Sequence, residues 1–559
     1  MTTTRAAHVI AHVEIRGIQA YVFRTGRLRD TIGRSVLVES LTDPDQPPLS
    51  ELLGDGVELV ERRSGSFDVT GTPEAVRRFV AAYTRALAVT TRELRLVVAY
   101  DDPDVANPAV TLARARLQSP EGLGLAPLLG VERCVLTGGS AETLWRRPGV
   151  DLPVVAEVLA ARERGRTWHD RFEKQALSHV PHFALPVDME SIAPSKQESS
   201  RVAVVVADLN GLGDKLALWA SLGRSEDAGD ILRRCMKELG VHLARTAADW
   251  VESTEGGYRT LGVPEHLRFE LATHAAEPGE AEPVAAGSRS DLPFAPVILG
   301  GDDLVFVCES RLALGLVQEV VHFFDAVPEE SARAELAKLG GPFATNGRID
   351  LTFGVGVAID KVGYSLQRVH DRAELLAKAA KRRRRLVLAD RDAPDHHAVS
   401  WTTLRWDPHR SSDLAEARVY VTTADAVALG QWLHDNSRTG VELLDSLLDL
   451  LDPKVPGSLR SDDAAGSELA PWSQQRSWLK TELAKAIRTH RSDATPASRS
   501  ERRAKLEDAL AARGPEMPRG VGRGLSDHKL ELLGDALVLL DEHLTLPASY
   551  PAAHKELNP

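Results

Sequence analysis

A Gly-Gly-Asp-Asp tetrapeptide at residues 300–303, set between two apolar segments, constrains this chain more than any other feature. Segments 297–299 and 304–307 are rich in β-branched and aromatic residues, which favour strands, and glycine permits a tight turn between them. The sequence therefore predicts a hairpin with two carboxylates at its tip. Because burying unpaired carboxylates is costly, Asp302 and Asp303 should face water or a cation. Both an ordinary acidic surface turn and a turn that binds Mg²⁺ fit this pattern.

A second apolar run, at residues 202–207, ends in a carboxylate at Asp208. The polar and flexible residues that follow it are Asn210, Gly211 and Gly213. A helix is predicted to begin near Asp214, so that backbone N–H groups at its start can meet phosphate. If this strand pairs antiparallel with the hairpin, Asp208 and Asp302 lie at one edge of the sheet. Two carboxylates from adjacent strands suit metal-assisted phosphoryl chemistry.

These two blocks resemble the palm domain of GGDEF-type nucleotidyl cyclases. They are more similar to the second palm of the large subunit of type III CRISPR effector complexes, a family that makes cyclic oligoadenylates from ATP. That family usually has Asp-x-Asp after the first strand, whereas this chain has Asp208-Leu-Asn210, one carboxylate fewer. A third matching block is the strand 352–359 followed by the helix 373–381. The resemblance implies a lysine directed at the triphosphate, and Lys381 fits best, with Lys378 one turn earlier.

The residue pattern and the resemblance together define an expected site. Asp208, Asp302 and Asp303 are the expected catalytic residues and the expected ligands of Mg²⁺ or Mn²⁺. The expected nucleotide-binding residues are Gly300, Gly301, Asn210, Gly211, Gly213, Lys378, Lys381, Ser64 and Gly65. In the reaction that the resemblance implies, the 3′-hydroxyl of one ATP attacks the α-phosphate of another and pyrophosphate leaves. Repeated addition and ring closure would give a cyclic oligonucleotide; adenine as the base comes from the resemblance alone.

Residues 8–100 form a second candidate palm, because their predicted order is βαββαβ, the ferredoxin-like pattern. The segments 17–19 and 28–35 resemble the first palm of the same CRISPR family. The hairpin tip of this palm carries Ser64-Gly65-Ser66 in place of carboxylates, so it should not hold metal, although its backbone can cradle phosphate. We expect the two hairpin tips to line one shared cleft; in the alternative, the first palm is only a buttress.

A chain of 559 residues should contain more than one domain. We expect an α/β (α+β) fold with two ferredoxin-like palms and a C-terminal helical bundle. The predicted parts are a degenerate first palm at 1–104, a linker and helical segment at 105–199, the second palm at 200–398 with an insertion at 245–295, and a helical domain at 399–559. Cys134 stands alone where the family often carries a zinc module, so no zinc is expected. The His-Asp pairs at 169–170 and 370–371 are predicted to be solvated.

Composition and the resemblance set the expected location and partners. The net charge of −12 argues against a surface that coats nucleic acid as a whole, but it permits one basic groove. Three cysteines without metal-ligand spacing, no apolar run of membrane-spanning length and no secretory core predict a cytoplasmic protein without a membrane segment. The resemblance implies that the C-terminal domain meets guide or target RNA and other effector subunits; a structural buttress is the alternative. A catalytically decayed nucleotide- or RNA-binding scaffold and a stand-alone cyclic dinucleotide synthase remain as rival functions.

Overall fold

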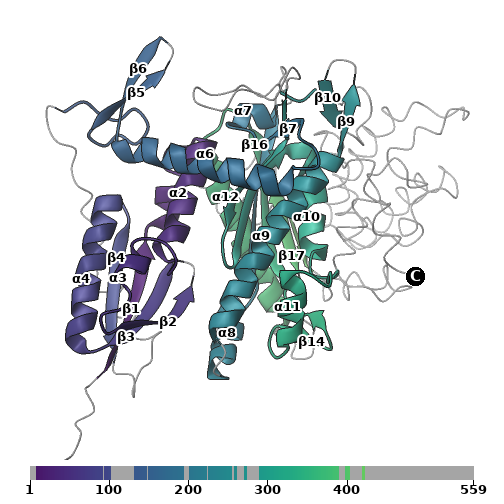
Figure 1. The fold of residues 1–559 in the computed structure, drawn as a ribbon. Coiled ribbons are helices and arrows are strands. Elements are labelled where there is room, and N and C mark those ends of the chain that lie inside the picture. The colour runs from purple at the N-terminus through teal and green to yellow at the C-terminus, as the bar shows by residue number, and fades with distance from the viewer. Residues whose placement is uncertain are drawn as a thin grey trace, which may run out of the picture.

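The computed structural model describes two palm-like sheets and a long helix that spans both (Figure 1). The described residues lie between 8 and 421, with gaps at 64, 92, 102–130, 148, 194–199, 223–224, 255–256, 261–269, 273–288, 389–396 and 403–417. The expected α/β class with two ferredoxin-like palms is confirmed by the sheets described below. The helical domain predicted at 399–559 falls almost entirely outside these residues. No helix in the described part is both long enough and apolar enough to cross a membrane.

The first palm has the ferredoxin-like sheet order β2-β3-β1-β4, with antiparallel neighbours throughout. Its strands are β1 (Val9–Arg16), β2 (Val57–Arg63), β3 (Ser66–Gly71) and β4 (Arg95–Asp101). Its helices are α1 (Ile18–Val22), α2 (Leu28–Leu41), α3 (Leu49–Leu52) and α4 (Pro73–Thr90). The Thr72 hydroxyl caps α4 by accepting the Ala75 N–H, and Pro73 occupies the first turn, where proline is tolerated. Phe67, Phe79 and Tyr83 pack as an aromatic cluster between sheet and helix.

The second palm has a six-stranded sheet in the order β12-β13-β8-β16-β17-β18. The strands are β8 (Arg201–Leu209), β12 (Phe294–Leu299), β13 (Asp303–Glu309), β16 (Phe353–Lys361), β17 (Ala398–Thr402) and β18 (Arg418–Val421). The first four repeat the ferredoxin-like order, and β17 adds parallel to β16. Because β17 and β18 continue this sheet, the palm extends to Val421, and the boundary predicted at residue 398 lies too early.

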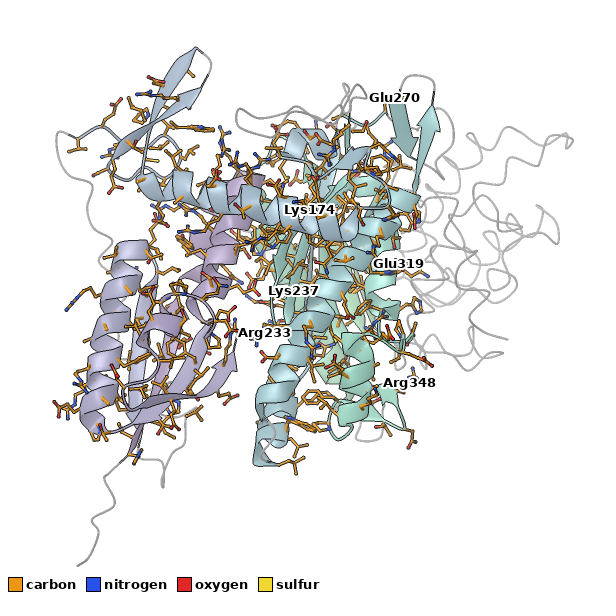
Figure 2. All side chains as sticks on the ribbon, in the orientation of Figure 1. Lys174, Arg233, Lys237, Glu270, Glu319 and Arg348 are labelled. Carbon is orange, nitrogen blue, oxygen red and sulfur yellow. The ribbon has the colours of Figure 1, made fainter. Side chains whose placement is uncertain are left out.

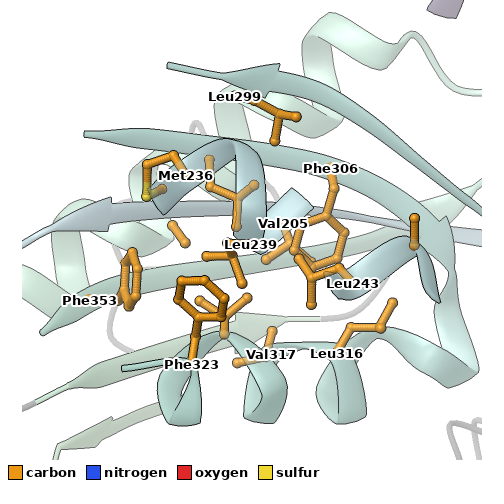
Figure 3. Close-up of a cluster of buried hydrophobic side chains, with 14 of the residues drawn as sticks. Val205, Met236, Leu239, Leu243, Leu299, Phe306, Leu316, Val317, Phe323 and Phe353 are labelled. Carbon is orange, nitrogen blue, oxygen red and sulfur yellow. The ribbon is translucent and has the colours of Figure 1, made fainter. Parts of the chain in front are cut away.

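Helices cover both faces of the second sheet. They are α8 (Leu212–Ser221), α9 (Ser225–Asp249), α10 (Ala313–His322), α11 (Ala332–Leu339) and α12 (Leu366–Leu388). On one face, α9 and α10 pack Leu239, Leu243 and Val317 against strand residues such as Val205 and Phe306 (Figure 3). On the other face, α12 shares a core with α1 and α2 of the first palm. The two palms are therefore joined by one continuous apolar core.

The predicted insertion at 245–295 is shorter than expected, because its first residues still belong to α9, which ends at Asp249. A hairpin follows, formed by β9 (Val251–Thr254) and β10 (Gly257–Thr260). Farther along, β11 (Ser290–Asp291) pairs in parallel with β7 (Phe183–Ala184), which comes from the segment between the palms. The insertion therefore starts about one helical turn later than the sequence indicated.

The segment predicted as a linker at 105–199 contains a brace between the palms. It includes the hairpin β5 (Thr143–Arg147) and β6 (Val150–Val154), the helix α6 (Ala156–Ala176) and the short helix α7 (Met189–Ile192). Helix α6 crosses α2 with the backbones in contact: a Cβ at Gly33 would lie 1.7 Å from the Ala161 carbonyl oxygen, and one at Gly165 2.3 Å from that of Arg29. The other end of α6 packs into the second palm's core, so α6 spans both palms (Figure 1).

Candidate nucleotide and metal site

Strand pairing brings three carboxylates together at one edge of the second sheet. β13 pairs antiparallel with β8 so that Asp303 lies opposite Asp208. The turn from β12 to β13 is closed by two backbone hydrogen bonds between Gly300 and Asp303, of 3.0 and 3.1 Å, and the Leu209 N–H donates to the Asp302 carbonyl at 3.2 Å. As a result, carboxylate oxygens of Asp208, Asp302 and Asp303 all lie within 4.8 Å of one another.

The electrostatics of this cluster favour a bound cation. Burial and the neighbouring Asp208 raise the pKa of Asp302. Burial raises the pKa of Asp303 well above its usual range, and the charges of Asp302 and Asp208 raise it further. A divalent ion would relieve this repulsion, and three hard carboxylate oxygens match the ligand preference of Mg²⁺ and Mn²⁺. The donor set therefore fits the expected metal.

The two expected phosphate lysines of α12 are both engaged with carboxylates. Lys381 forms an ion pair with Asp208, and its ammonium group donates to the Leu209 carbonyl at 3.3 Å. Lys378 pairs with Glu374 at 2.7 Å. The stem of Lys381 passes directly over β16 at Gly354, where a Cβ would come within 2.5 Å of its Cγ. A glycine within a strand can mark such a close approach, and this signal was available in the sequence.

A cavity of about 310 Å³ opens at the carboxylate cluster and has walls from both palms. Of the expected site residues, those that line it are Asp208, Asp302, Asp303, Gly300, Gly301, Lys378, Lys381 and Gly65. Gly65 belongs to the hairpin tip of the first palm and has a φ of +68°, a conformation that favours glycine. Its neighbour Ser64 lies outside the described residues. The two hairpin tips therefore border one cavity.

Three expected nucleotide-binding residues, Asn210, Gly211 and Gly213, are not among the residues that line this cavity. The Asn210 side chain is only 1% exposed, and its amide donates to the Thr352 hydroxyl at 3.1 Å. Its backbone N–H also donates to the Thr352 carbonyl, at 2.8 Å. Gly211 has a φ of +63° and turns the chain toward α8. Asn210 thus ties the end of β8 to the start of β16, which local sequence did not reveal.

The cavity also has residues that were not predicted for the site. Gln19 of α1 donates to Glu374 of α12 at 2.9 Å, so the two palms are joined beside the cavity. His370 was predicted to be solvated, but it is only 2% exposed and stacks on Phe23 with ring centroids 3.7 Å apart. His169, in the other His-Asp pair, is also buried. His370, Glu374 and Lys378 recur every four residues, a spacing that places them on one helix face and that sequence reasoning could have used.

Comparison with known proteins identifies the fold. No protein-family model matches the chain, and no curated protein sequence matches it. Among solved structures, the apo Csm1–Csm4 cassette matches with a TM-score of 0.50 and 14% identity over 97% of this chain and 70% of that chain. The Csm1–Csm4 cassette in complex with cA4 has a TM-score of 0.49 and 13% identity over 96% and 70% of the two chains. Csm1 of T. onnurineus has a TM-score of 0.47 and 14% identity over 97% and 70%. The chain has the fold of Csm1, a type III CRISPR subunit, which confirms at the level of the fold the resemblance found in the sequence.

Proposed function

We propose that this protein is a metal-dependent nucleotidyltransferase that joins ATP molecules into cyclic oligoadenylates, in antiviral signalling of the type III CRISPR kind. The observation that carries the proposal is the cluster of Asp208, Asp302 and Asp303, which opens into a cavity between two palms. The fold shared with Csm1 supports the same reading. ATP as the substrate rests on the sequence resemblance.

The residues around the cavity have distinct roles in this proposal. Asp208, Asp302 and Asp303 would hold Mg²⁺ or Mn²⁺, which supplies Lewis-acid activation of a 3′-hydroxyl and charge stabilisation at the α-phosphate. Lys381 neutralises part of the carboxylate charge through its ion pair with Asp208. Gly300 and Gly301 leave room for a phosphate to approach the backbone.

The shared cavity accounts for how one chain could position two nucleotides. Bond formation requires the reacting atoms to lie about 3–3.5 Å apart, and a lone palm positions a single nucleotide. In this chain the tip of the first palm, at Gly65, borders the same cavity as the carboxylates of the second. We infer that one nucleotide lies on the metal side and the second against the first palm.

Product analysis tests this function. The purified protein is incubated with each nucleoside triphosphate and Mg²⁺ or Mn²⁺, with and without RNA, and products are separated and identified by mass spectrometry. We expect a cyclic adenylate from ATP, and we expect the double variant Asp302→Asn with Asp303→Asn to make none. Asp170→Asn, on the exposed surface of α6, is the matched control. No product under any condition would favour the scaffold, and a cyclic dinucleotide made without RNA would favour the stand-alone synthase.

A partner subunit is also part of the proposal. The similar structure is a Csm1–Csm4 cassette, so we propose that this chain assembles with another effector subunit. Guide or target RNA as a further partner rests on the sequence resemblance alone. Co-expression with candidate neighbouring subunits followed by size-exclusion chromatography would detect a stable complex. A chain that elutes alone in every combination would contradict this part of the proposal and leave the catalytic part intact.

A further inference from the structure

Two arginines, one from each palm, line the cavity that contains the carboxylate cluster. Arg62 is the last but one residue of β2, close to the first palm's hairpin tip, and Arg233 belongs to α9 of the second palm. Figure 2 shows Arg233 and Lys237 on the side of α9 that faces the first palm. The backbones are close there as well, since a Cβ at Gly229, one turn before Arg233, would lie 3.9 Å from the Arg62 carbonyl oxygen.

Both guanidinium groups are largely buried, and they oppose each other electrostatically. The exposed fractions of the two side chains are 13% for Arg62 and 14% for Arg233. Burial and the nearby charge of Arg62 lower the pKa of Arg233 to about 10. Two like charges held together at a cavity wall are costly unless an anion joins them.

Acidic groups lie close to the two arginines, and the charges of Glu39 and Asp43 oppose the lowering of the Arg233 pKa. Asp43 pairs with Arg62 at 3.3 Å, and Glu39 pairs with Lys237 at 2.9 Å. The Nε of Arg62 is buried and has no hydrogen-bond partner among the described residues. The carboxylate that pairs with Arg233 is that of Asp230, whose side chain is 66% exposed, and exposed ion pairs contribute little.

We propose that Arg62 and Arg233 form a clamp for the phosphate chain of a nucleotide in the cavity, with one guanidinium from each palm. This inference rests on the proposed function and assigns it two positioning residues. Guanidinium groups bind phosphate with paired, charge-assisted hydrogen bonds, which lysine cannot reproduce. A phosphate chain bound between the two guanidinium groups would contact both palms. It would also fix the position of the nucleotide's α-phosphate within the cavity.

The test compares the binding of AMP, ADP and ATP to the full chain by calorimetry, with Ca²⁺ in place of Mg²⁺ to suppress turnover. We expect the wild-type protein to bind ATP more tightly than AMP. Loss of one charge-assisted phosphate contact should weaken ATP binding about 10- to 100-fold in Arg62→Gln and in Arg233→Gln. AMP binding should change much less, so the ratio of the AMP and ATP dissociation constants should fall. Arg233→Lys should give an intermediate ratio, because lysine keeps the positive charge but cannot donate the paired hydrogen bonds of a guanidinium group.

Two controls separate a phosphate contact from a structural one. Arg234→Gln alters the next residue on α9, which pairs with Glu335 at 2.7 Å. Asp170→Asn alters an exposed residue of α6 that does not line the cavity. Both should keep the wild-type ratio. The clamp is refuted if Arg62→Gln and Arg233→Gln also keep that ratio, or if they weaken all three nucleotides by one factor.

The ratio is measured within each variant, so a partly unfolded sample does not obscure it. The outcome is also distinct from that of the proposed function. A protein that forms no product can still bind ATP more tightly than AMP and lose that preference in the arginine variants. A protein without the clamp can still form product at saturating ATP.

Discussion

Replacing Asp303 by asparagine should stabilise the metal-free protein, although it removes a side chain that the site needs. Carboxylate oxygens of Asp208, Asp302 and Asp303 lie within 4.8 Å of one another. Two unit charges at that separation repel by about 3.5 kcal/mol at an effective dielectric constant of about 20. Asp303 faces two such charges, and the attraction of Lys381 offsets part of the repulsion. We therefore expect a net gain of about 1–3 kcal/mol at neutral pH.

The sign of the pH dependence follows from the raised pKa of Asp303. In the folded protein this carboxyl group holds its proton at a higher pH than in the unfolded chain. The folded state therefore binds more protons between the ordinary pKa of Asp and the raised one, and the free energy of unfolding falls as pH rises through that window. Asparagine does not titrate, so the Asp303→Asn variant does not lose stability in this way as pH rises. The variant and the wild-type protein should have similar melting temperatures at the acid end of the window and should diverge as pH increases.

Thermal unfolding in EDTA and in Mn²⁺, measured as a function of pH, tests this reasoning. A gain of 1 kcal/mol corresponds to about 2–4 °C for a domain of 150–250 residues. Mn²⁺ should raise the melting temperature of the wild-type protein by mass action and that of Asp303→Asn much less. Asp170→Asn, on an exposed helix face, should follow the wild-type protein in both solutions. If Asp303→Asn melts lower than the wild-type protein in EDTA at neutral pH, or if Mn²⁺ stabilises both equally, the three carboxylates do not form a repulsive metal site.

Three other substitutions give equally direct outcomes. Lys381→Met should lower both the melting temperature in EDTA and the rate of product formation, because the lysine compensates the carboxylate cluster; an unchanged melting curve would show that its ion pair is dispensable. Asn210→Asp would place a charge in the buried contact with Thr352, so it should cost about 1–3 kcal/mol in urea unfolding. It should also leave the Mg²⁺ dependence of the rate unchanged, and a higher rate at low Mg²⁺ would mean that this side chain reaches the metal. Gly165→Ala should lower the free energy of unfolding by about 2 kcal/mol or more, because the added methyl group meets backbone atoms of α2. Gly363→Ala has free space around the added methyl group and should leave stability unchanged. Equal melting temperatures for the two variants would refute the tight crossing of α6 and α2.

The parts of the site that the sequence predicted are those set by one strand or one turn. The apolar run before Asp208 predicts a strand that ends at this carboxylate. The Gly-Gly-Asp-Asp turn between apolar segments predicts a hairpin. Antiparallel pairing of the strand with the hairpin then aligns the carboxylates. The contact of Asn210 with Thr352 could not be predicted, because Thr352 is 142 residues away in the chain. No local pattern shows whether a side chain after a strand faces a ligand or a neighbouring strand.

The opposite wall of the cavity could not be predicted for a related reason. Gln19 and Arg62 belong to the first palm, and they meet α12 and α9 only because the two palms pack together. Helix α12 is rich in charged residues and looks solvated in the sequence, yet His370 is buried against Phe23 of the first palm. Helical periodicity identifies which residues share a face, but it does not identify the partner that covers that face.

This packing also determines how a nucleotide can enter. The core between the palms contains Leu28 and Ile32 from α2, and Val204 and Val305 from the second sheet. Each fully buried side chain of this kind contributes about 1.5–3 kcal/mol to the stability of the folded state. Exposing even a few of them would therefore cost as much free energy as most of the roughly 5–15 kcal/mol by which a typical domain is stable. The close backbone contact of α6 with α2 at Gly33 is a further link that holds the palms together. We therefore expect substrates to reach the cavity without separation of the palms, which stay together throughout the reaction.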